Sequence, residues 1–560
     1  MIRLFETNEI RASKALDGLW DFAIMPRKGT LPARYTHRLP VPGCWENHPA
    51  FHTYQGAGAY RTRVKVGAGE PNLRFTFKGV GHTARVFFDG REIATHYNAY
   101  TAFSALVKKV SAGEHELVVE ADNSFHEDSS LHLPNDYYSY GGITRPVVLE
   151  EVPELFIERL QFTPTYSDGA WGADIQAVVA NIGPRADDVR IRCELAGTTF
   201  ELDQARVEPG QSQVLRGYAS IPGAAAWSSA SPVLYALKAQ LYVGAEASPS
   251  DDLIERVGFR IVSTDGGKLR LNGEEVVLKG FNRHEDHPLV GSAFPLALMV
   301  QDLDLMEEMG ANAVRTSHYP NDERFLDLCD ERGIFVWEEN HARGLSIADM
   351  RHPRFIEQCA DVNREMVEQH VNHPSIVIWG ILNECASDCE EGRAHYARQF
   401  EQIRSMDHSR PLTFASHHRD RELCFDLADI VSFNLYPGWY GDEDPGELVD
   451  EARKWAQVGG TGKPIIMSEF GADGYYGYRD PTRVRGTEER QAEIIGANLA
   501  AYTARDYLSG MFIWQFCDCR VTEATGWLLT RAGTQNSKGI VDRYRRPKLA
   551  YETVKRFFQP

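Results

Sequence analysis

Two glutamates close apolar runs in the second half of the chain. Glu384 ends the segment that begins at Ser375, and Glu469 ends the segment that begins at Lys463. An acid directly after a buried strand lies at the strand's carboxyl end, where (β/α)8 barrels display the residues of their active sites. Two carboxyls across such a mouth, one as proton donor and one as nucleophile or base, can break a glycosidic bond. The alternative is two unrelated surface acids, but both follow β-rich runs and neither lies on an amphipathic helix face.

The elements around these glutamates alternate between strand and helix after about residue 263. Eight strands are expected, near residues 276–281, 312–316, 334–338, 375–382, 411–415, 430–435, 464–468 and 511–516. Helices fit between most of them, notably at residues 296–309, 322–332, 355–371, 447–457, 488–507 and 548–558. Such units predict a closed barrel over residues 263–560. Glu384 would end its fourth strand and Glu469 its seventh, on opposing arcs of the mouth.

The first half of the chain has the shorter alternation that is typical of β-sandwiches. Up to about residue 153, runs such as residues 72–78 and 115–120 are separated by Gly, Asp and Pro. Residues 154–262 form a second β-rich segment with the spacing of a smaller immunoglobulin-like sandwich. The predicted fold class is therefore a multidomain β plus α/β protein, with two sandwiches followed by a (β/α)8 TIM barrel.

Composition and charge fit a globular enzyme and not a binder of nucleic acid. The 560 residues are 43% hydrophobic and carry a formal net charge of −19, which disfavours nucleic acid and anionic membranes as partners. No apolar stretch approaches the roughly 20 residues needed to span a bilayer. The first residues lack a basic start followed by an apolar core, so no secretory signal is expected and the expected location is cytoplasmic.

The sequence predicts neither a metal site nor a disulfide framework. The nine cysteines are an odd and scattered set, so reduced thiols are expected. The pairs Cys385/Cys389 and Cys517/Cys519 do not repeat the spacing of a structural zinc site. The segment that begins at His284 also lacks the spacing of the His-Glu-x-x-His zinc motif.

Residues beside the two glutamates indicate how these acids would divide the chemistry. Asn383 precedes Glu384, and its amide can hydrogen-bond a sugar hydroxyl. Glu469 has to stay ionised to attack a sugar, and a nearby cation such as Arg315 would favour the ionised form. The separation of the two carboxyls decides between retention and inversion of configuration. Because a sequence contains no distance, both outcomes stay open at this level.

Four segments resemble glycoside hydrolase family 2, and within it the β-glucuronidases: residues 282–286, 315–320, 372–384 and 463–471. The resemblance extends from residue 16 to residue 548. It implies a jelly-roll sugar-binding domain at residues 1–153, an immunoglobulin-like domain, a catalytic barrel, no cofactor and a homo-oligomer. It also implies retention through a covalent glycosyl-enzyme intermediate, with Glu384 as acid/base and Glu469 as nucleophile. Cys385 stands where the family usually has proline.

A turn near the end of the chain indicates which sugar is bound. Asn536 and Lys538 resemble the Asn-x-Lys motif by which β-glucuronidases hold the uronate carboxylate, and they follow the eighth predicted strand. A buried carboxylate needs a cation and hydrogen-bond donors in place of its hydration, and these side chains supply both. Arg531 would be a second cation, although it lies five residues before Asn536 and the family has it four before. On spacing alone, an ordinary polar turn remains the alternative.

Aromatic residues at the predicted mouth also match the family. Tyr436 would lie beside the nucleophile and Tyr440 against the sugar, with Pro437 in place of the usual tyrosine. Trp514, at the end of the eighth strand, would form the floor under the sugar ring. For all three aromatic residues, packing within the barrel is the structural alternative.

Three polar residues are further candidates for contacts with sugar hydroxyls. His284 and His318 match in kind, and the alternative for each is a structural histidine. Asp136 lies in a segment that resembles the reach of the family's jelly roll into the barrel, and the alternative is a residue that caps a turn. The connection from residue 341 to residue 354 is short, which predicts an open mouth.

The leading hypothesis is a retaining, exo-acting β-glucuronidase. A β-galacturonidase or a dual uronidase is the first alternative, because its substrate differs only at the C4 hydroxyl and would use the same lysine. A β-galactosidase would leave Asn536 and Lys538 without a purpose. An inactive carbohydrate-binding protein is the alternative from a different class, and it is disfavoured because both glutamates are present.

Overall fold

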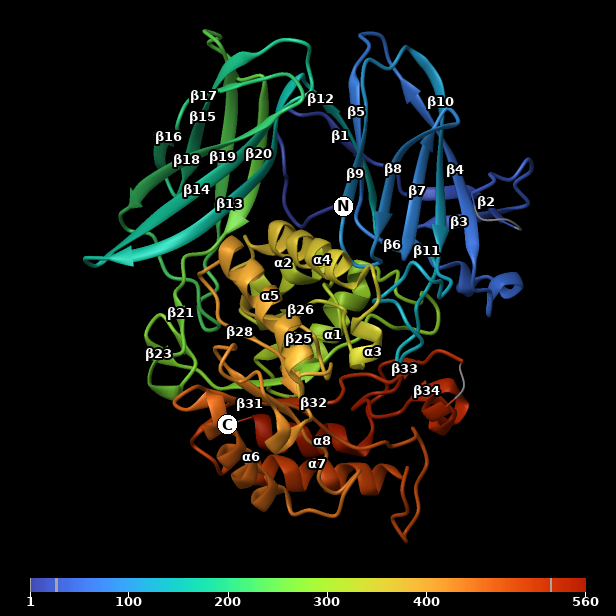
Figure 1. The fold of residues 1–560 in the computed structure, drawn as a ribbon, viewed down its shortest axis with the longest axis vertical. Coiled ribbons are helices and arrows are strands. Elements are labelled where there is room, and N and C mark those ends of the chain that lie inside the picture. The colour runs from blue at the N-terminus through green and yellow to red at the C-terminus, as the bar shows by residue number, and fades with distance from the viewer. Residues whose placement is uncertain (1, 26–28, 524–525, 560) are drawn as a thin grey trace.

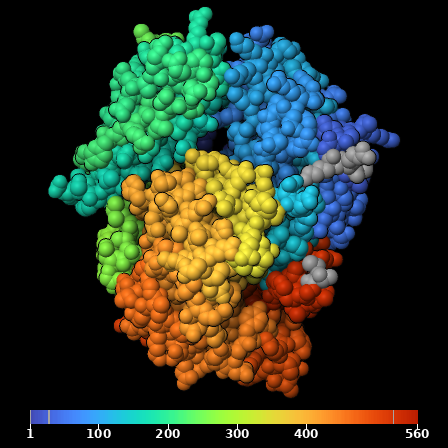
Figure 2. All heavy atoms as spheres, viewed as in Figure 1, coloured from blue at the N-terminus to red at the C-terminus, as the bar shows by residue number. Residues whose placement is uncertain are grey.

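The computed structural model describes residues 2–25, 29–523 and 526–559. Two β-rich domains lie side by side, and both rest on a barrel formed by the second half of the chain (Figure 1). In the space-filling view, the cyan part of the N-terminal domain borders both the yellow and the red parts of the barrel (Figure 2). Among the described residues, no helix is long and apolar enough to cross a membrane.

The N-terminal domain is a sandwich of a four-stranded and a six-stranded antiparallel sheet. The strand orders are β1-β12-β5-β9 and β3-β2-β4-β10-β7-β8, and β6 pairs with β11. Alternate residues such as Phe75 and Phe77 are fully buried, as expected for strands with one face toward a core. The strands are β1 (Ser13–Ala15), β2 (Gly18–Ile24), β3 (His37–Val41), β4 (Ala57–Val66), β5 (Asn72–Phe77), β6 (Val80–Gly81), β7 (Thr83–Phe88), β8 (Arg91–Tyr97), β9 (Phe103–Val107), β10 (Gly113–Asp122), β11 (Gly142–Ile143) and β12 (Val147–Val152).

The second domain is a smaller antiparallel sandwich. One sheet has the order β13-β14-β18, and the other has the order β16-β15-β19-β20 with β17 beside β15. Its strands are β13 (Leu155–Ser167), β14 (Ala170–Asn181), β15 (Asp187–Leu195), β16 (Thr198–Glu201), β17 (Ala205–Val207), β18 (Ser212–Ile221), β19 (Tyr235–Val243) and β20 (Asp251–Val257). Three short strands, β21 (Val262–Ser263), β22 (Arg270–Leu271) and β23 (Glu274–Glu275), follow it before the barrel.

The second half of the chain closes into a parallel barrel. Its strand order is β28-β27-β26-β25-β24-β32-β31-β30-β29. β28 and β29 stand at the two ends of this order, and only Phe414 separates them in the chain, so together they close the circle. The strands are β24 (Leu278–Asn282), β25 (Ala313–Thr316), β26 (Phe335–Glu339), β27 (Ile376–Gly380), β28 (Leu412–Thr413), β29 (Ala415–Ser416), β30 (Val431–Asn434), β31 (Ile465–Phe470) and β32 (Leu508–Ile513). A short pair, β33 (Cys519–Arg520) and β34 (Gln535–Asn536), lies beyond β32.

Helices cover the outside of the barrel and bury one stripe each. In α1 the buried stripe contains Met299, Leu303 and Met306. The side chain of Asp322 accepts a hydrogen bond from Arg324 N and thereby caps α2. The helices are α1 (Leu296–Glu308), α2 (Glu323–Arg332), α3 (Ile347–Met350), α4 (Phe355–His370), α5 (Glu390–Met406), α6 (Pro445–Gly460), α7 (Glu488–Thr503) and α8 (Leu549–Phe558). The predicted fold class is confirmed, and each predicted barrel strand overlaps an observed one.

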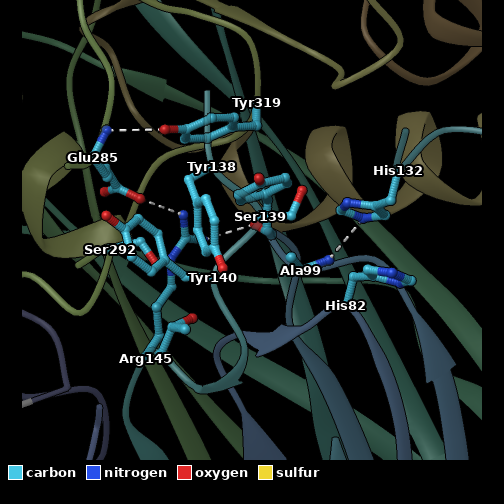
Figure 3. Close-up of a pocket in the computed structure, with 12 residues that line it drawn as sticks. His82, Ala99, His132, Tyr138, Ser139, Tyr140, Arg145, Glu285, Ser292 and Tyr319 are labelled. Atoms are coloured by element: carbon cyan, nitrogen blue, oxygen red, sulfur yellow. Dashed lines mark hydrogen bonds and ion pairs between the residues drawn. The ribbon is translucent and has the colours of Figure 1, made fainter. Parts of the chain in front are cut away.

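A segment of the N-terminal domain is fastened to the barrel through buried polar contacts. Arg145 donates hydrogen bonds to Glu285 Oε2 at 2.9 Å and to the Pro320 carbonyl at 2.7 Å. The Tyr140 hydroxyl donates to Asp286 Oδ2 at 2.8 Å. Arg145, Glu285 and Tyr140 line a small enclosed cavity where the two domains meet (Figure 3). The preceding residues of the same segment, which include Asp136, are therefore held at the barrel.

A buried glutamate holds this segment from the other side and should make stability depend on pH. Glu46 accepts hydrogen bonds from Gly141 N and from Asn123 Nδ2, both at 2.9 Å. Burial raises the pKa of Glu46 to about 8, although those donors lower it. Since the folded pKa lies above the unfolded value, stability is lost as the pH rises from about 4.5 to about 8.

The Glu46→Gln variant cannot ionise and should escape this loss. Its melting temperature should equal that of the wild type near pH 4.5 and should exceed it by a growing amount up to pH 8. At pH 8 the free energy of unfolding of the variant should be higher by on the order of a few kcal/mol. Thermal melts between pH 4.5 and pH 8.5 test the expectation. A constant offset between the two proteins at every pH would contradict it.

Candidate active site

The two glutamates come from different kinds of backbone at the barrel mouth. Glu469 lies within β31, as predicted, and is buried. The prediction that Glu384 ends its strand is wrong: β27 ends at Gly380, two residues before the predicted end, and Glu384 lies four residues further, on the following loop. The physical reason is that Leu382 and Glu384 adopt left-handed φ angles of 47° and 51°. The Leu382 amide donates to the side chain of Asn340 and not to a neighbouring strand.

One buried guanidinium connects the surroundings of both glutamates. Arg315 Nη1 donates to Glu469 Oε1 at 2.8 Å, and Nη2 donates to Asn383 Oδ1 at 2.8 Å. Its Nε and Nη2 also donate to the two oxygens of Glu339 at 2.9 and 2.8 Å. A planar group with five donors suits this arrangement, and a lysine could not replace it. The sequence had placed Arg315 beside Glu469, but Glu339 was missed, although it too ends a strand.

Asn434 and Tyr436 complete the contacts of the two carboxyls. Asn434, at the end of β30, donates from Nδ2 to Glu384 Oε1 at 2.9 Å and to Asn383 Oδ1 at 3.1 Å. The Tyr436 hydroxyl donates to Glu469 Oε2 at 2.7 Å. Glu384 and Glu469 are therefore linked through hydrogen bonds by Asn434, Asn383 and Arg315. Asn434 was not predicted as a site residue.

The two carboxyls titrate as an interacting pair. Burial and the charge of Glu384 raise the pKa of Glu469 to about 7, although Arg315 and Tyr436 lower it. Burial also raises the pKa of Glu384, but Arg343 and further donors lower it by more, so it lies below its ordinary value. Near neutral pH the pair therefore gains or loses one proton to the solvent. Glu469 accepts from a guanidinium and a phenol, and both contacts favour its ionised form.

Aromatic and histidine side chains form one wall beside Glu469. The His318 ring stacks on Trp514 with centroids 5.0 Å apart, and its Nδ1 lies 2.7 Å from Glu339 Oε1. His284 lies edge-on to Trp514 at 5.4 Å, and its Nδ1 is 3.2 Å from the Tyr319 hydroxyl. Burial holds the pKa of both histidines well below the ordinary value, so both rings are neutral at pH 7. Nε2 of each ring has no hydrogen-bond partner among the described residues, and Nε2 of His318 lies 3.7 Å from Glu469 Oε1, so both are available to a ligand hydroxyl.

The residues predicted to hold a carboxylate are brought together. Asn536 Nδ2 donates to Asp136 Oδ2 at 2.8 Å, and Arg531 donates to both oxygens of Asp136, with Nε at 2.8 Å from Oδ1. Lys538 Nζ lies 3.2 Å from Asp473 Oδ2 and about 5 Å above the rings of Trp439 and Tyr440, at 5.1 and 5.3 Å. We call Asp136, Asp473, Arg531, Asn536 and Lys538 the clamp. Asp136, which was expected to contact a sugar hydroxyl, thus contacts Arg531 and Asn536 of the clamp, and Asp473 was not predicted.

A buried ion pair supports the clamp from behind. Lys548 Nζ donates to Asp518 Oδ1 at 2.6 Å and to the Ser537 carbonyl at 3.1 Å. Asp518 also accepts from Gly539 N at 2.8 Å and from Gln535 Nε2 at 3.1 Å. The turn that carries Asn536 and Lys538 is thus fixed at both ends.

Arg343 is a further cation at the mouth that sequence reasoning missed. Its Nη2 lies 3.9 Å from Glu384 Oε2, and its Nη1 donates to Asn135 of the N-terminal domain. Its guanidinium also lies 5.9 Å from the ring of Trp527. Arg343 follows β26 by a few residues, so its position after a predicted strand was the available signal. It joins the acid of the barrel to the domain that carries Asp136.

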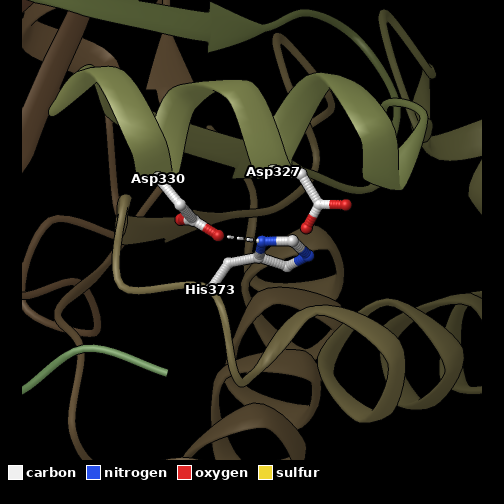
Figure 4. Close-up of side chains that lie close together, drawn as sticks. All are labelled: Asp327, Asp330 and His373. Atoms are coloured by element: carbon white, nitrogen blue, oxygen red, sulfur yellow. Dashed lines mark hydrogen bonds and ion pairs between the residues drawn. The ribbon is translucent and has the colours of Figure 1, made fainter. Parts of the chain in front are cut away.

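Asp327, Asp330 and His373 form a buried group outside the mouth whose ligand atoms lie close enough to hold a metal ion (Figure 4). Their charges are already matched by other contacts. Asp330 Oδ2 lies 2.6 Å from His373 Nδ1, and Arg3 Nη2 donates to Asp327 Oδ1 at 2.8 Å.

The nine cysteines, all within the described residues, are free thiols.

The chain is similar to a solved structure and to curated sequences of glycosidases. The crystal structure of a GH2 β-galacturonidase from Eisenbergiella tayi bound to galacturonate is 46% identical, with a TM-score of 0.95, and the match covers 100% of this chain and 99% of that chain. The β-glucuronidase of Paenibacillus borealis is 26% identical over 586 residues, 96% of each chain. The β-glucuronidase of Sus scrofa is 28% identical over 429 residues, and the match spans 74% of this chain and 63% of the relative.

Two family models match the chain. The model described as "Glycosyl hydrolases family 2, TIM barrel domain" matches residues 262–560, and the model described as "Glycosyl hydrolases family 2, sugar binding domain" matches residues 13–153. The first match alone covers more than half of the chain, and it contains both glutamates, Arg315 and four of the five clamp residues. The chain is therefore a glycoside hydrolase and belongs to glycoside hydrolase family 2.

Proposed function

We propose that the protein is a retaining, exo-acting β-uronidase that removes a uronic acid from the non-reducing end of a β-glycoside. The observation that carries this proposal is the combination of two linked carboxyls, Glu384 and Glu469, with a clamp that contains a buried lysine. The carboxyls are suited to break the bond, and Lys538 with Asn536 is suited to hold a carboxylate on the sugar.

In the proposed double displacement, Glu469 attacks the anomeric carbon as the carboxylate while Glu384 donates its proton to the leaving oxygen. Without substrate the order of the two pKa values is the reverse, with that of Glu469 raised to about 7 and that of Glu384 lowered, so the proposal requires the pair's proton to lie on Glu384 in the substrate complex. Arg315 and Tyr436 hold Glu469 through 2.8 and 2.7 Å hydrogen bonds, and this fixes the attacking oxygen and favours its ionised form. Glu384 then takes a proton from water, which hydrolyses the glycosyl-enzyme. The reaction needs positioned carboxyls and water, and no cofactor.

We propose β-D-galacturonides as the preferred substrates and β-D-glucuronides as the second candidate. The sequence motifs alone favour glucuronides as the first candidate. The similarity to the Eisenbergiella tayi β-galacturonidase, at 46% identity over the whole chain, exceeds the 26% identity to the Paenibacillus borealis β-glucuronidase, and this difference favours galacturonides. The clamp serves either sugar, because the two differ only at the C4 hydroxyl.

The test compares 4-nitrophenyl β-D-galacturonide, β-D-glucuronide and β-D-galactoside side by side. The galacturonide should give the highest kcat/KM, and the galactoside, which lacks the carboxylate, should give the lowest. Faster turnover of the glucuronide would reverse the order of the two candidates. Turnover of the galactoside alone, or of none of the three, would overturn the uronidase proposal.

Replacing Lys538 by alanine should reduce kcat/KM on the preferred uronide by about 10²–10³-fold. The substrate carboxylate would then be buried without its cation, and removal of one partner of a desolvated charge pair costs roughly 2–5 kcal/mol. Lys454→Ala is the matched control, since the side chain of Lys454 is 71% exposed on helix α6 and pairs with Glu451. Unchanged uronide turnover by a folded Lys538→Ala variant would contradict the role of the clamp.

A further inference from the structure

The clamp contains as many acids as cations before any substrate arrives. Lys538 pairs with Asp473, and Arg531 pairs with Asp136. Arg531 Nη1 also lies 3.7 Å from Asp473 Oδ2. Lys538 and Asp136 are only 1% and 3% exposed, and Asp473 is 8% exposed. A substrate carboxylate would therefore enter a buried cluster in which two positive charges already face two negative ones.

Asp473 differs from Asp136 in how its oxygens are used. Both oxygens of Asp136 accept hydrogen bonds, one from Arg531 alone and the other from Arg531 and Asn536. Asp473 Oδ2 faces Lys538, but its Oδ1 is buried and has no hydrogen-bond partner among the described residues. Asp473 also lines a cavity of about 480 Å³ between the loops after β30 and β31 and the segment that carries Arg531. Asp473 is therefore the clamp acid that has a buried oxygen without a hydrogen-bond partner among the described residues and that also lines a cavity.

Two carboxylates that share one site cannot both stay ionised without cost, and one of them binds a proton more strongly. We propose that Asp473 takes up one proton from solvent when the substrate's carboxylate binds to Lys538, and releases it when the uronic acid leaves. This inference rests on the proposed function. The protonated Asp473 then donates its O–H to the bound carboxylate, so Lys538 is shared without a third negative charge in the clamp.

The other charged and titratable groups around Asp473 leave it as the acceptor of that proton. The acid on the neighbouring turn, Asp518, is bound to Lys548 and Gly539, and burial raises its pKa to about 7. Its contacts are directed to the turn and not to the clamp cations, and the Asp473→Asn variant distinguishes the two acids. Arg485 lines the same cavity and donates to the Trp439 carbonyl. The groups that face Asp473 from all neighbouring segments are Lys538, Arg531, Asp136, Arg485, Tyr440, Tyr475 and Asp518.

The experiment counts protons during binding of D-galacturonate, and of D-glucuronate, by titration calorimetry in buffers of different ionisation enthalpy at pH 6, 7 and 8. All proteins carry Glu469→Gln, so that the proton of the catalytic pair does not enter the balance. The background protein should take up about one proton per uronate at its maximum, and the Asp473→Asn protein close to none. Asp442→Asn is the matched control, because it removes an exposed acid from the same loop as Tyr440 and should leave the uptake unchanged.

Steady-state kinetics give a second measurement in proteins with intact Glu469. The KM of wild type for the preferred aryl uronide should rise by up to about tenfold per pH unit at alkaline pH, and the KM of Asp473→Asn should stay level. Uronate binding without proton uptake in the background protein overturns the inference even if the Asp473→Asn variant does not fold. Equal uptake with and without Asp473 also overturns it. Absence of both uronate binding and uronide turnover would instead refute the proposed function.

Discussion

Replacing Glu469 by alanine is expected to lower kcat on the preferred aryl β-uronide by about 10⁴-fold or more, which corresponds to about 5.5 kcal/mol or more in the activation free energy. Without this carboxylate no covalent intermediate forms, and the remaining side chains only bind the sugar. Single-turnover and steady-state assays measure the loss. Glu443→Gln is the matched control, since Glu443 is a partly exposed acid that pairs with Arg419 away from the network of Glu469.

Chemical rescue separates the loss of a nucleophile from a general loss of structure. Azide can occupy the space that the Glu469 carboxylate leaves and attack the same face of the sugar, so the product should be the α-glycosyl azide. Its formation identifies the face from which Glu469 acts. A β-glycosyl azide from this variant, or wild-type activity without azide, would contradict the assignment of Glu469 as nucleophile.

The sequence could predict those features that depend on local pattern. Apolar runs bounded by turns located the barrel strands, and the rule that polar residues after parallel strands meet at one mouth located Glu469, Arg315 and Tyr436. The same rule would have found Glu339 and Asn434, which end β26 and β30, had it been applied to every strand. The local pattern therefore also contains the positions of Glu339 and Asn434.

Contacts between segments far apart in the chain could not be predicted. Asp136 and Arg531 are 395 residues apart, and their ion pair depends on how the N-terminal sandwich rests on the barrel. Lys538 and Asp473 are in contact because two loops that follow different strands lie side by side. The sequence of either loop does not predict this arrangement. The backbone at Glu384 also escaped prediction, because its left-handed φ belongs to a residue type that rarely adopts it. These long-range contacts set the charge of the clamp.

Replacing Glu384 by glutamine is expected to slow the reaction in a way that depends on the leaving group. General acid catalysis contributes about 10²–10⁴-fold, and the contribution is larger when the departing oxygen is more basic. Glutamine keeps the shape of the side chain and the hydrogen bond from Asn434, which is 2.9 Å in the structure, but it has no proton to give. A methyl or other alkyl uronide should therefore lose about 10³–10⁴-fold in kcat/KM, and the 4-nitrophenyl uronide clearly less.

The ratio of these two losses is the decisive quantity, because a misplaced substrate would reduce both reactions alike. With the good leaving group, formation of the glycosyl-enzyme survives and its hydrolysis becomes slow, since Glu384 also activates the water. A burst of 4-nitrophenol followed by slow turnover should therefore appear, and azide should accelerate the second phase to give the β-glycosyl azide. Equal losses for both leaving groups, without a burst, would exclude Glu384 as the acid/base and leave Arg343 and His417 holding a carboxylate that serves only to bind.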